Sequence, residues 1–116
     1  MIRARTRTPG PRKGMNQLES RYAQRLEAMR LAGEIAAWRY ESLKLRLADK
    51  TWYTPDFEVL LNDGGLELHE TKGFWQDDAK VKIKVAAEQY PEIVFRVVRE
   101  VRKQWVLEEV SNGREQ

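Results

Sequence analysis

TWYTPDFEVLLNDGGLELHETKG, residues 51–73, contains two strand-like runs on either side of a turn signal. The first run covers residues 51–61, and the Asn-Asp-Gly-Gly sequence of residues 62–65 is typical of a β-hairpin loop. Residues 66–72 form the return run, and Gly73 ends it. This stretch therefore predicts two antiparallel strands joined by a short loop.

The return strand carries charged side chains on its apolar side. Successive side chains of a strand alternate between faces, so Glu70 and Lys72 share a face with Leu66 and Leu68. Two ionisable groups on the face that turns toward the core cost free energy unless they are paired or bind a metal ion. This placement indicates a functional site, with a cross-strand salt bridge on an exposed edge as the alternative.

The length of the hairpin loop decides whether Asp56 joins this pair. An even-length loop would turn Asp56 away from Glu70, whereas a loop of residues 63–65 with a glycine at positive φ would place Asp56 opposite Lys72. The same register would place Glu58 opposite Glu70. We therefore predict an odd-length loop or a bulge. The alternative for Asp56 is a turn residue that follows a proline.

The sequence on both sides of the hairpin predicts an α/β fold. The predicted elements are a helix over residues 17–32, strands over residues 35–40 and 42–47, a helix from Asp77 or Asp78 to Pro91, and a strand over residues 93–98. The last strand follows a helical crossover and is expected to lie parallel to the return strand. Residues 100–110 fit a helix and a strand equally well. The result is a small mixed β-sheet flanked by helices, in the order αβββαβ.

Composition limits the chemistry that is available. The chain of 116 residues has room for one domain and contains no cysteine. A metal ion would bind to oxygen ligands or to His69, which favours a hard cation such as Mg²⁺ or Mn²⁺. His69 has the opposite strand parity to Glu70, so it is expected to face away from the site. No apolar run is long enough for a membrane span and no secretory signal is evident, so we expect a cytoplasmic protein.

Residues 1–14 form a basic segment that differs from the rest of the chain. They hold five basic side chains and no acidic one, whereas the whole chain has a net charge of +3. The five are Arg3, Arg5, Arg7, Arg12 and Lys13. Prolines and glycines in this segment predict a disordered arm, followed by a domain over residues 15–110 and a tail over residues 111–116. Such an arm is a common means of holding a polyanion, and the alternative is a tail that only adds solubility.

Residues 53–57 (YTPDF) and 70–73 (ETKG) resemble the core of the PD-(D/E)XK nucleases, as does the order of the predicted elements. The chain is also similar to small phage-encoded proteins with this core, and phage junction resolvases and transposon-end endonucleases use the same kind of residue set. The resemblance covers about residues 16–98. It implies a restriction-endonuclease-like fold. It also implies that the protein is located in the cytoplasm of a bacterium or of the bacterial host of a phage.

The resemblance also implies roles for individual residues. Asp56 and Glu70, with the backbone carbonyl of Thr71, would bind one or two Mg²⁺ or Mn²⁺ ions. The metal would lower the pKa of a bound water and stabilise charge on the scissile phosphate. Lys72 would orient that water or neutralise the developing charge.

A fourth candidate catalytic residue lies on the first helix. Residues 18–19 (LE) and 21–22 (RY) match the phage-encoded proteins, which makes Glu19 the candidate. By helical geometry Glu19 lies about 60° from the centre of the apolar face, whereas Glu27 lies about 140° away. The alternative is that Glu19 only completes a capping box with Asn16, because one side chain cannot fill both roles.

Other residues are candidates for holding a nucleic acid. Lys80 and Lys84 lie one turn apart on the second predicted helix and could follow a phosphate backbone. Trp75 could stack on bases. The alternatives are a solvated lysine face and an aromatic core plug.

The sequence thus predicts a metal-dependent DNA endonuclease that hydrolyses phosphodiester bonds. Branched or junction DNA is one candidate substrate and would favour a homodimer with two active sites. Nicking or single-strand cutting is the other. The alternative functions are a catalytically inactive nucleic-acid-binding module on a nuclease scaffold and a protein-interaction domain.

Overall fold

The computed structural model of the chain describes residues 2–4, 14–73 and 77–110. These residues form two helices and two β-sheets, a five-stranded sheet with strand order β2-β5-β6-β7-β8 and a three-stranded sheet with order β1-β3-β4. In chain order the elements are β1 (Ile2–Ala4), α1 (Gln17–Leu31), β2 (Ala37–Tyr40), β3 (Leu43–Ala48), β4 (Thr51–Tyr53), β5 (Phe57–Leu60), β6 (Leu66–Thr71), α2 (Asp77–Gln89), β7 (Val94–Val101) and β8 (Gln104–Glu109). The predicted α/β class with a mixed sheet and flanking helices is confirmed.

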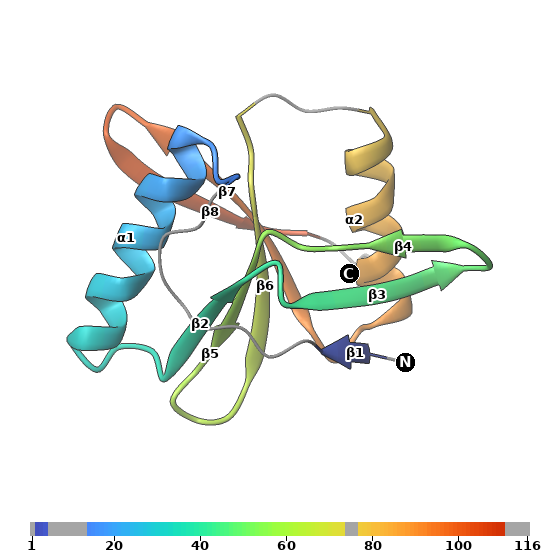
Figure 1. The fold of residues 1–116 in the computed structure, drawn as a ribbon, viewed down its shortest axis with the longest axis horizontal. Coiled ribbons are helices and arrows are strands. Elements are labelled where there is room, and N and C mark those ends of the chain that lie inside the picture. The colour runs from blue at the N-terminus through green and yellow to red at the C-terminus, as the bar shows by residue number, and fades with distance from the viewer. Residues whose placement is uncertain (1, 5–13, 74–76, 111–116) are drawn as a thin grey trace, which may run out of the picture.

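The five-stranded sheet lies between two apolar cores. Helix α1 covers one face, and α2 with the three-stranded sheet covers the other (Figure 1). Tyr22 and Leu26 of α1 pack with Phe57 of β5 in the first core. Leu68 of β6 packs with Ile83 of α2 in the second. Strands β5 and β6 therefore lie in the interior of the sheet, with an apolar core on each side.

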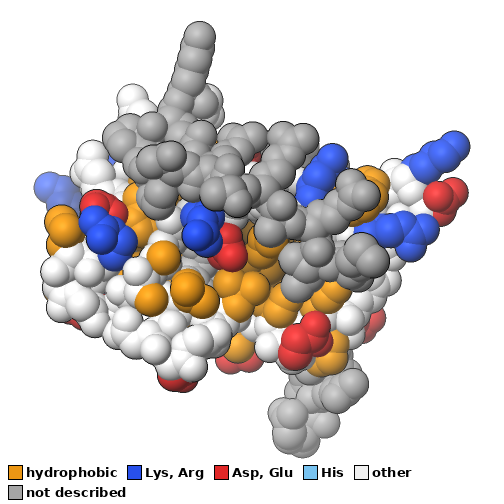
Figure 2. Space-filling view, turned by 60° about the horizontal axis from the view of Figure 1, so that its bottom comes forward, with side chains coloured by type: hydrophobic (Ala, Val, Ile, Leu, Met, Phe, Trp, Pro, Cys, Tyr) orange, Lys and Arg blue, Asp and Glu red, His pale blue; other side chains and the backbone are white. Residues whose placement is uncertain are grey.

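Hydrophobic side chains also reach the surface. On the face that Figure 2 shows, they form a broken band among scattered charged side chains. Within the described ranges, neither helix is long and apolar enough to span a membrane.

Helix α1 begins with a complete capping box. The Asn16 side chain accepts a hydrogen bond from the Glu19 N–H at 2.7 Å, and Glu19 Oε1 accepts one from the Asn16 N–H at 3.0 Å. The capping box thus satisfies the N–H groups of Asn16 and Glu19, which have no partner within the helix. The helix ends at Leu31, one residue before the predicted end, and Gly33 reverses the chain with φ +79°.

The strand predicted over residues 51–61 is in fact two strands in different sheets, so that prediction was wrong. Strand β4 pairs with β3 in the three-stranded sheet, whereas β5 pairs with β2 and β6 in the five-stranded sheet. Pro55 lies between them, and a proline has no N–H to donate to a strand ladder. Asp56 therefore stands where the chain passes from one sheet to the other.

The hairpin between β5 and β6 has an odd-length loop, as predicted. The Leu61 N–H donates to the Gly65 carbonyl at 2.8 Å, so the loop consists of residues 62–64. Gly64 has φ +92°, a conformation that a glycine adopts without a steric penalty.

The register of this hairpin differs from the specific pairing that the sequence suggested. Glu58 lies opposite Leu68 and not opposite Glu70, because the loop begins one residue earlier and ends one residue earlier than expected. The ladder continued by one residue places Asp56 beside Glu70 and not beside Lys72. The predicted odd loop length is therefore confirmed, although the predicted partner of Asp56 was wrong.

The C-terminal half extends the sheet. Strand β7 lies parallel to β6 after the α2 crossover, as predicted. Residues 100–110, for which helix and strand fitted equally well, are strand: β8 pairs antiparallel with the end of β7. Arg102 and Lys103 between them have φ of 52° and 63°, as in a two-residue type I′ turn.

The N-terminal segment differs from the expected disordered arm in one place. Residues Ile2–Ala4 form strand β1, which pairs antiparallel with β3, with Ile2 opposite Leu45. These backbone hydrogen bonds are possible because β4 occupies only one edge of β3. Residues 5–13 of the predicted arm and residues 111–116 of the predicted tail lie outside the described residues.

Candidate active site

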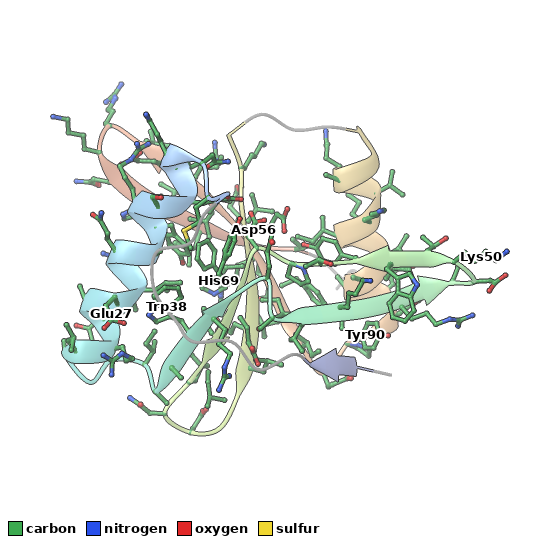
Figure 3. The ribbon with its side chains drawn as sticks, in the orientation of Figure 1. Glu27, Trp38, Lys50, Asp56, His69 and Tyr90 are labelled. Carbon is green, nitrogen blue, oxygen red and sulfur yellow. The ribbon has the colours of Figure 1, made fainter. Side chains whose placement is uncertain are left out.

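Asp56 and Glu70 lie side by side where β5 begins and β6 ends. The Asp56 N–H donates to Glu70 Oε1 at 3.3 Å. Thr71, the next residue on β6, donates to Asp56 Oδ2 twice, through its N–H at 3.0 Å and through Oγ1 at 2.9 Å. Figure 3 shows Asp56 near the middle of the molecule, between the two helices. Residues that are 14 positions apart in the sequence thus form one acidic pair.

Tyrosine hydroxyl groups hold two of the acidic residues. Tyr53 Oη donates to Glu70 Oε1 at 2.7 Å, and Tyr40 Oη donates to Glu19 Oε1 at 3.0 Å. Burial, followed by the charge of Glu70, raises the pKa of the Tyr53 hydroxyl well above its usual range, so this group remains a donor. The sequence did not identify these tyrosines. The position of Tyr53, just before the Pro55 break, is the signal that could have indicated the first.

The protein environment disfavours the ionised forms of the pair. Burial raises the pKa of Asp56, and the negative charges of Glu70 and Glu19 raise it further, against the two hydrogen bonds from Thr71. Burial also raises the pKa of Glu70, against the hydrogen bonds from Tyr53 and from the Asp56 N–H. A bound cation would offset both the desolvation and the mutual repulsion.

Glu19 is buried, with 9% of its surface exposed, and its Oε1 accepts both the Asn16 N–H and the Tyr40 hydroxyl. The capping-box alternative is therefore realised. Glu19 is nevertheless close enough for its charge to raise the pKa of Asp56 and Glu70. Glu27 instead accepts from Trp38 Nε1 at 2.8 Å, away from Asp56 in Figure 3.

The residues fit a hard cation, although they do not enclose one. Within the described ranges, no three or more His, Cys, Asp and Glu residues are grouped so that they could hold a metal ion. The hydrogen bonds from Tyr53, Thr71 and the Asp56 N–H end on Asp56 Oδ2 and Glu70 Oε1. The remaining carboxylate oxygens form the type of oxygen donor set that Mg²⁺ uses together with water molecules.

Lys72 lines a small pocket together with lysines of α2. The Lys72 N–H donates to the Val98 carbonyl at 2.8 Å, which holds the chain beside β7. The pocket has a volume of about 150 Å³ and is lined by Lys72, Lys80, Ile83, Lys84, Val97, Glu108 and Val110. The structure thus brings Lys80 and Lys84 to the same place as Lys72. Lys82, on the same helix, does not line the pocket.

Other predicted nucleic-acid-binding residues are not placed. Arg3 lies in β1, and nothing is described of its side chain. Arg5, Arg7, Arg12, Lys13 and Trp75 lie outside the described residues. His69 faces α1, on the opposite side of the sheet from Leu68, as its parity predicted.

Comparisons with known proteins show a similarity to a phage nuclease. No family model and no solved structure match the chain. The chain is 35% identical over 81 residues to Endonuclease I of Escherichia phage T7. The alignment covers 70% of this chain and 50% of that protein, so the chain spans about half the length of the curated relative that it matches. Over most of its length, this chain is therefore similar to a phage nuclease.

Proposed function

We propose that this protein is a metal-dependent endonuclease that hydrolyses phosphodiester bonds in DNA. The observation that carries the proposal is the adjacent pair Asp56 and Glu70, joined by the Asp56 N–H, with Lys72 two residues farther along the chain. The similarity to Endonuclease I of phage T7 supports the same function.

In the proposed site, different residues bind the metal ion, orient the carboxylates and stabilise the charge of the phosphate. Asp56, Glu70 and the Thr71 carbonyl would hold Mg²⁺ or Mn²⁺, which supplies Lewis acidity and a more acidic water when it is bound. Thr71 fixes Asp56 Oδ2, and Tyr53 fixes Glu70 Oε1. Lys72, two residues after Glu70, lines the pocket that it shares with Lys80 and Lys84, and its positive charge would stabilise the negative charge of the reacting phosphate.

The lysines of α2 extend the site toward the DNA backbone. Lys80 and Lys84 are exposed and share a pocket with Lys72. In a bound DNA strand, the phosphate next to the reacting one would therefore contact these two lysines. The basic residues between positions 3 and 13 and Trp75 are further proposed contacts, on the basis of the sequence alone. Junction DNA is a proposed substrate because the sequence core resembles that of junction resolvases, and a homodimer would then supply two sites.

One assay tests the function. The protein is incubated with Mg²⁺ or Mn²⁺ and labelled duplex, single-stranded, flap and four-way-junction DNA. We expect metal-dependent cleavage of at least one substrate. The substitutions Asp56→Asn and Lys72→Ala should abolish it, whereas Asp49→Asn and Lys50→Ala, in the exposed β3–β4 turn, should not.

Two results would overturn the proposal. Binding without cleavage on every substrate would favour the inactive nucleic-acid-binding module. Cleavage that persists in EDTA, or in the Asp56→Asn variant, would point to a contaminant or to another site.

A further inference from the structure

Four polar side chains form a chain of hydrogen bonds on the α1 side of the sheet. Tyr22 Oη lies 2.6 Å from His69 Nδ1, and His69 Nε2 lies 2.9 Å from Glu67 Oε1. Arg96 of β7 completes the chain, because its Nε donates to Glu67 Oε1 at 2.9 Å and its Nη2 donates to Oε2 at 3.2 Å. Tyr22 and His69 are buried, with 1% and 4% of their surfaces exposed.

The partners fix the direction of each hydrogen bond. The hydrogen bond from His69 and the charge and hydrogen bond of Arg96 lower the pKa of Glu67 to about 2, so Glu67 is a carboxylate that only accepts. His69 Nε2 must therefore carry the proton and donate to Glu67. In the imidazole tautomer that carries its proton on Nε2, Nδ1 accepts, and Tyr22 Oη is the donor.

The packing around Tyr22 does not require its hydroxyl group. Tyr22 packs edge-on against Phe57 and Trp105, with ring centroids 5.4 and 5.0 Å apart, so a phenylalanine would fill the same space. Buried polar groups often contribute no more stability than apolar groups of similar size, and in some proteins their role is to fix one arrangement of the packed elements. The question is therefore which arrangement the Tyr22–His69 hydrogen bond fixes.

The hydrogen bond joins α1, which carries Glu19, to β6, which carries Glu70. Tyr22 lies on α1 less than one turn after Glu19, and His69 directly precedes Glu70 on β6. Glu67 and Arg96 hold His69 from the opposite side, so the imidazole cannot rotate without breaking a charged hydrogen bond.

We infer that Tyr22 and His69 are positioning residues, which hold the first turn of α1, and with it Glu19, against the end of β6 that carries Glu70. The inference rests on the proposed function, because it assigns Glu19 an electrostatic contribution to the metal site. It also accounts for a histidine that takes no direct part in the acidic pair.

The test is a double-mutant cycle with Mn²⁺ alone as the probe. Tyr22→Phe removes only the hydroxyl, and Glu19→Gln keeps a capping side chain while removing the charge. We expect Tyr22→Phe to weaken Mn²⁺ affinity about 10-fold and to cause no further loss in the Glu19→Gln background. Tyr90→Phe is the matched control, since it loses a hydroxyl hydrogen bond to the Arg46 carbonyl, at 2.9 Å, in the other core.

A second pair of variants covers the histidine side. His69→Asn places an amide where Nδ1 stood and should keep more Mn²⁺ affinity than His69→Ala, although both lose the contact with Glu67. Thermal unfolding of each variant shows that the measured protein is folded.

The outcomes separate the inference from the function. Unchanged Mn²⁺ affinity in Tyr22→Phe, or an equal loss in both backgrounds, would overturn the inference even if the wild-type protein cuts DNA. A wild-type protein that binds no Mn²⁺ would overturn it as well. If the wild-type protein binds Mn²⁺ and cuts no DNA, the proposed function is wrong. The Mn²⁺ affinities of the Tyr22→Phe and Glu19→Gln variants would then still test whether Tyr22 positions Glu19.

Discussion

The N–H of Asp56 donates to the side chain of Glu70, so one acidic residue of the candidate site helps to orient the other. The contact depends on the break at Pro55, which leaves the Asp56 N–H outside the ladder of β5. Thr71 then returns two hydrogen bonds to Asp56. The pair is thus held by two backbone N–H groups and by the Thr71 hydroxyl, and only the hydroxyl can be removed by a side-chain substitution.

Thr71→Val should reduce cleavage without unfolding the protein. It keeps the shape of the side chain and the N–H donor, but it removes the 2.9 Å hydrogen bond from Oγ1 to Asp56 Oδ2. Outer hydrogen bonds of metal ligands typically affect activity by 10-fold or more, so we expect a loss of kcat of about 10-fold. Thr51→Val is the control, because its hydroxyl bonds an exposed turn carbonyl. Equal effects of the two variants would contradict a role of Thr71 at the site.

Tyr53→Phe should weaken metal binding more than it weakens folding. The Tyr53 hydroxyl donates to Glu70 Oε1 at 2.7 Å and lowers the pKa of that carboxyl, so its loss favours the protonated form, which binds metal poorly. We expect Mn²⁺ affinity at neutral pH to fall about 10-fold. The fall should be smaller at higher pH, where Glu70 ionises without help. A loss that is the same at every pH would show that Tyr53 acts through packing.

Much of the architecture could be predicted from local signals. The Asn16 cap, the Gly64 turn and the helical crossover to β7 are each set by a few neighbouring residues, and the structure confirms all three. The odd length of the hairpin loop, and a His69 side chain on the opposite side of the sheet from Leu68, were also predicted correctly.

What the sequence did not reveal depends on pairing between distant segments. The assignment of β4 and β5 to different sheets follows from which edges β3 and β2 offer, and no local pattern contains that information. The hydroxyls of Tyr40 and Tyr53 reach Glu19 and Glu70 across 21 and 17 positions. Such contacts are specified by the packed fold and not by spacing along the chain.

The acidic pair should also make the metal-free protein less stable at high pH. Burial raises the pKa of Asp56 and Glu70 above the value of about 4 of a carboxyl in an unfolded chain. Above that pH the folded state holds more protons than the unfolded state, so the free energy of unfolding falls as pH rises through neutrality.

Thermal unfolding in EDTA at about pH 5 and about pH 8 measures this effect. Asp56→Asn should flatten the pH dependence, whereas Asp49→Asn, which removes an exposed carboxyl, should not. Added Mg²⁺ should raise the unfolding temperature more at the higher pH, because the ionised pair binds it. An unfolding temperature that rises from the lower to the higher pH in EDTA, and equally in Asp56→Asn, would contradict the raised pKa values.

The lysine pocket predicts a specific salt dependence of DNA binding. Lys80 and Lys84 line the pocket with Lys72, whereas Lys82 does not. Each phosphate contact contributes about 0.9 to the slope of log affinity against log salt for duplex DNA. Without divalent metal, the Lys80→Ala/Lys84→Ala variant should therefore bind more weakly, with a slope reduced by about 2.

Lys82→Ala makes the same change of charge on the same helix, so it separates a local contact from a general effect of net charge. If the pocket holds a backbone phosphate, Lys82→Ala should keep the wild-type slope, because a side chain that makes no phosphate contact releases no counterion. A reduction shared equally by Lys80→Ala, Lys82→Ala and Lys84→Ala would show that DNA senses only the overall charge of α2. The pocket would then have no specific part in holding the strand beside Asp56 and Glu70.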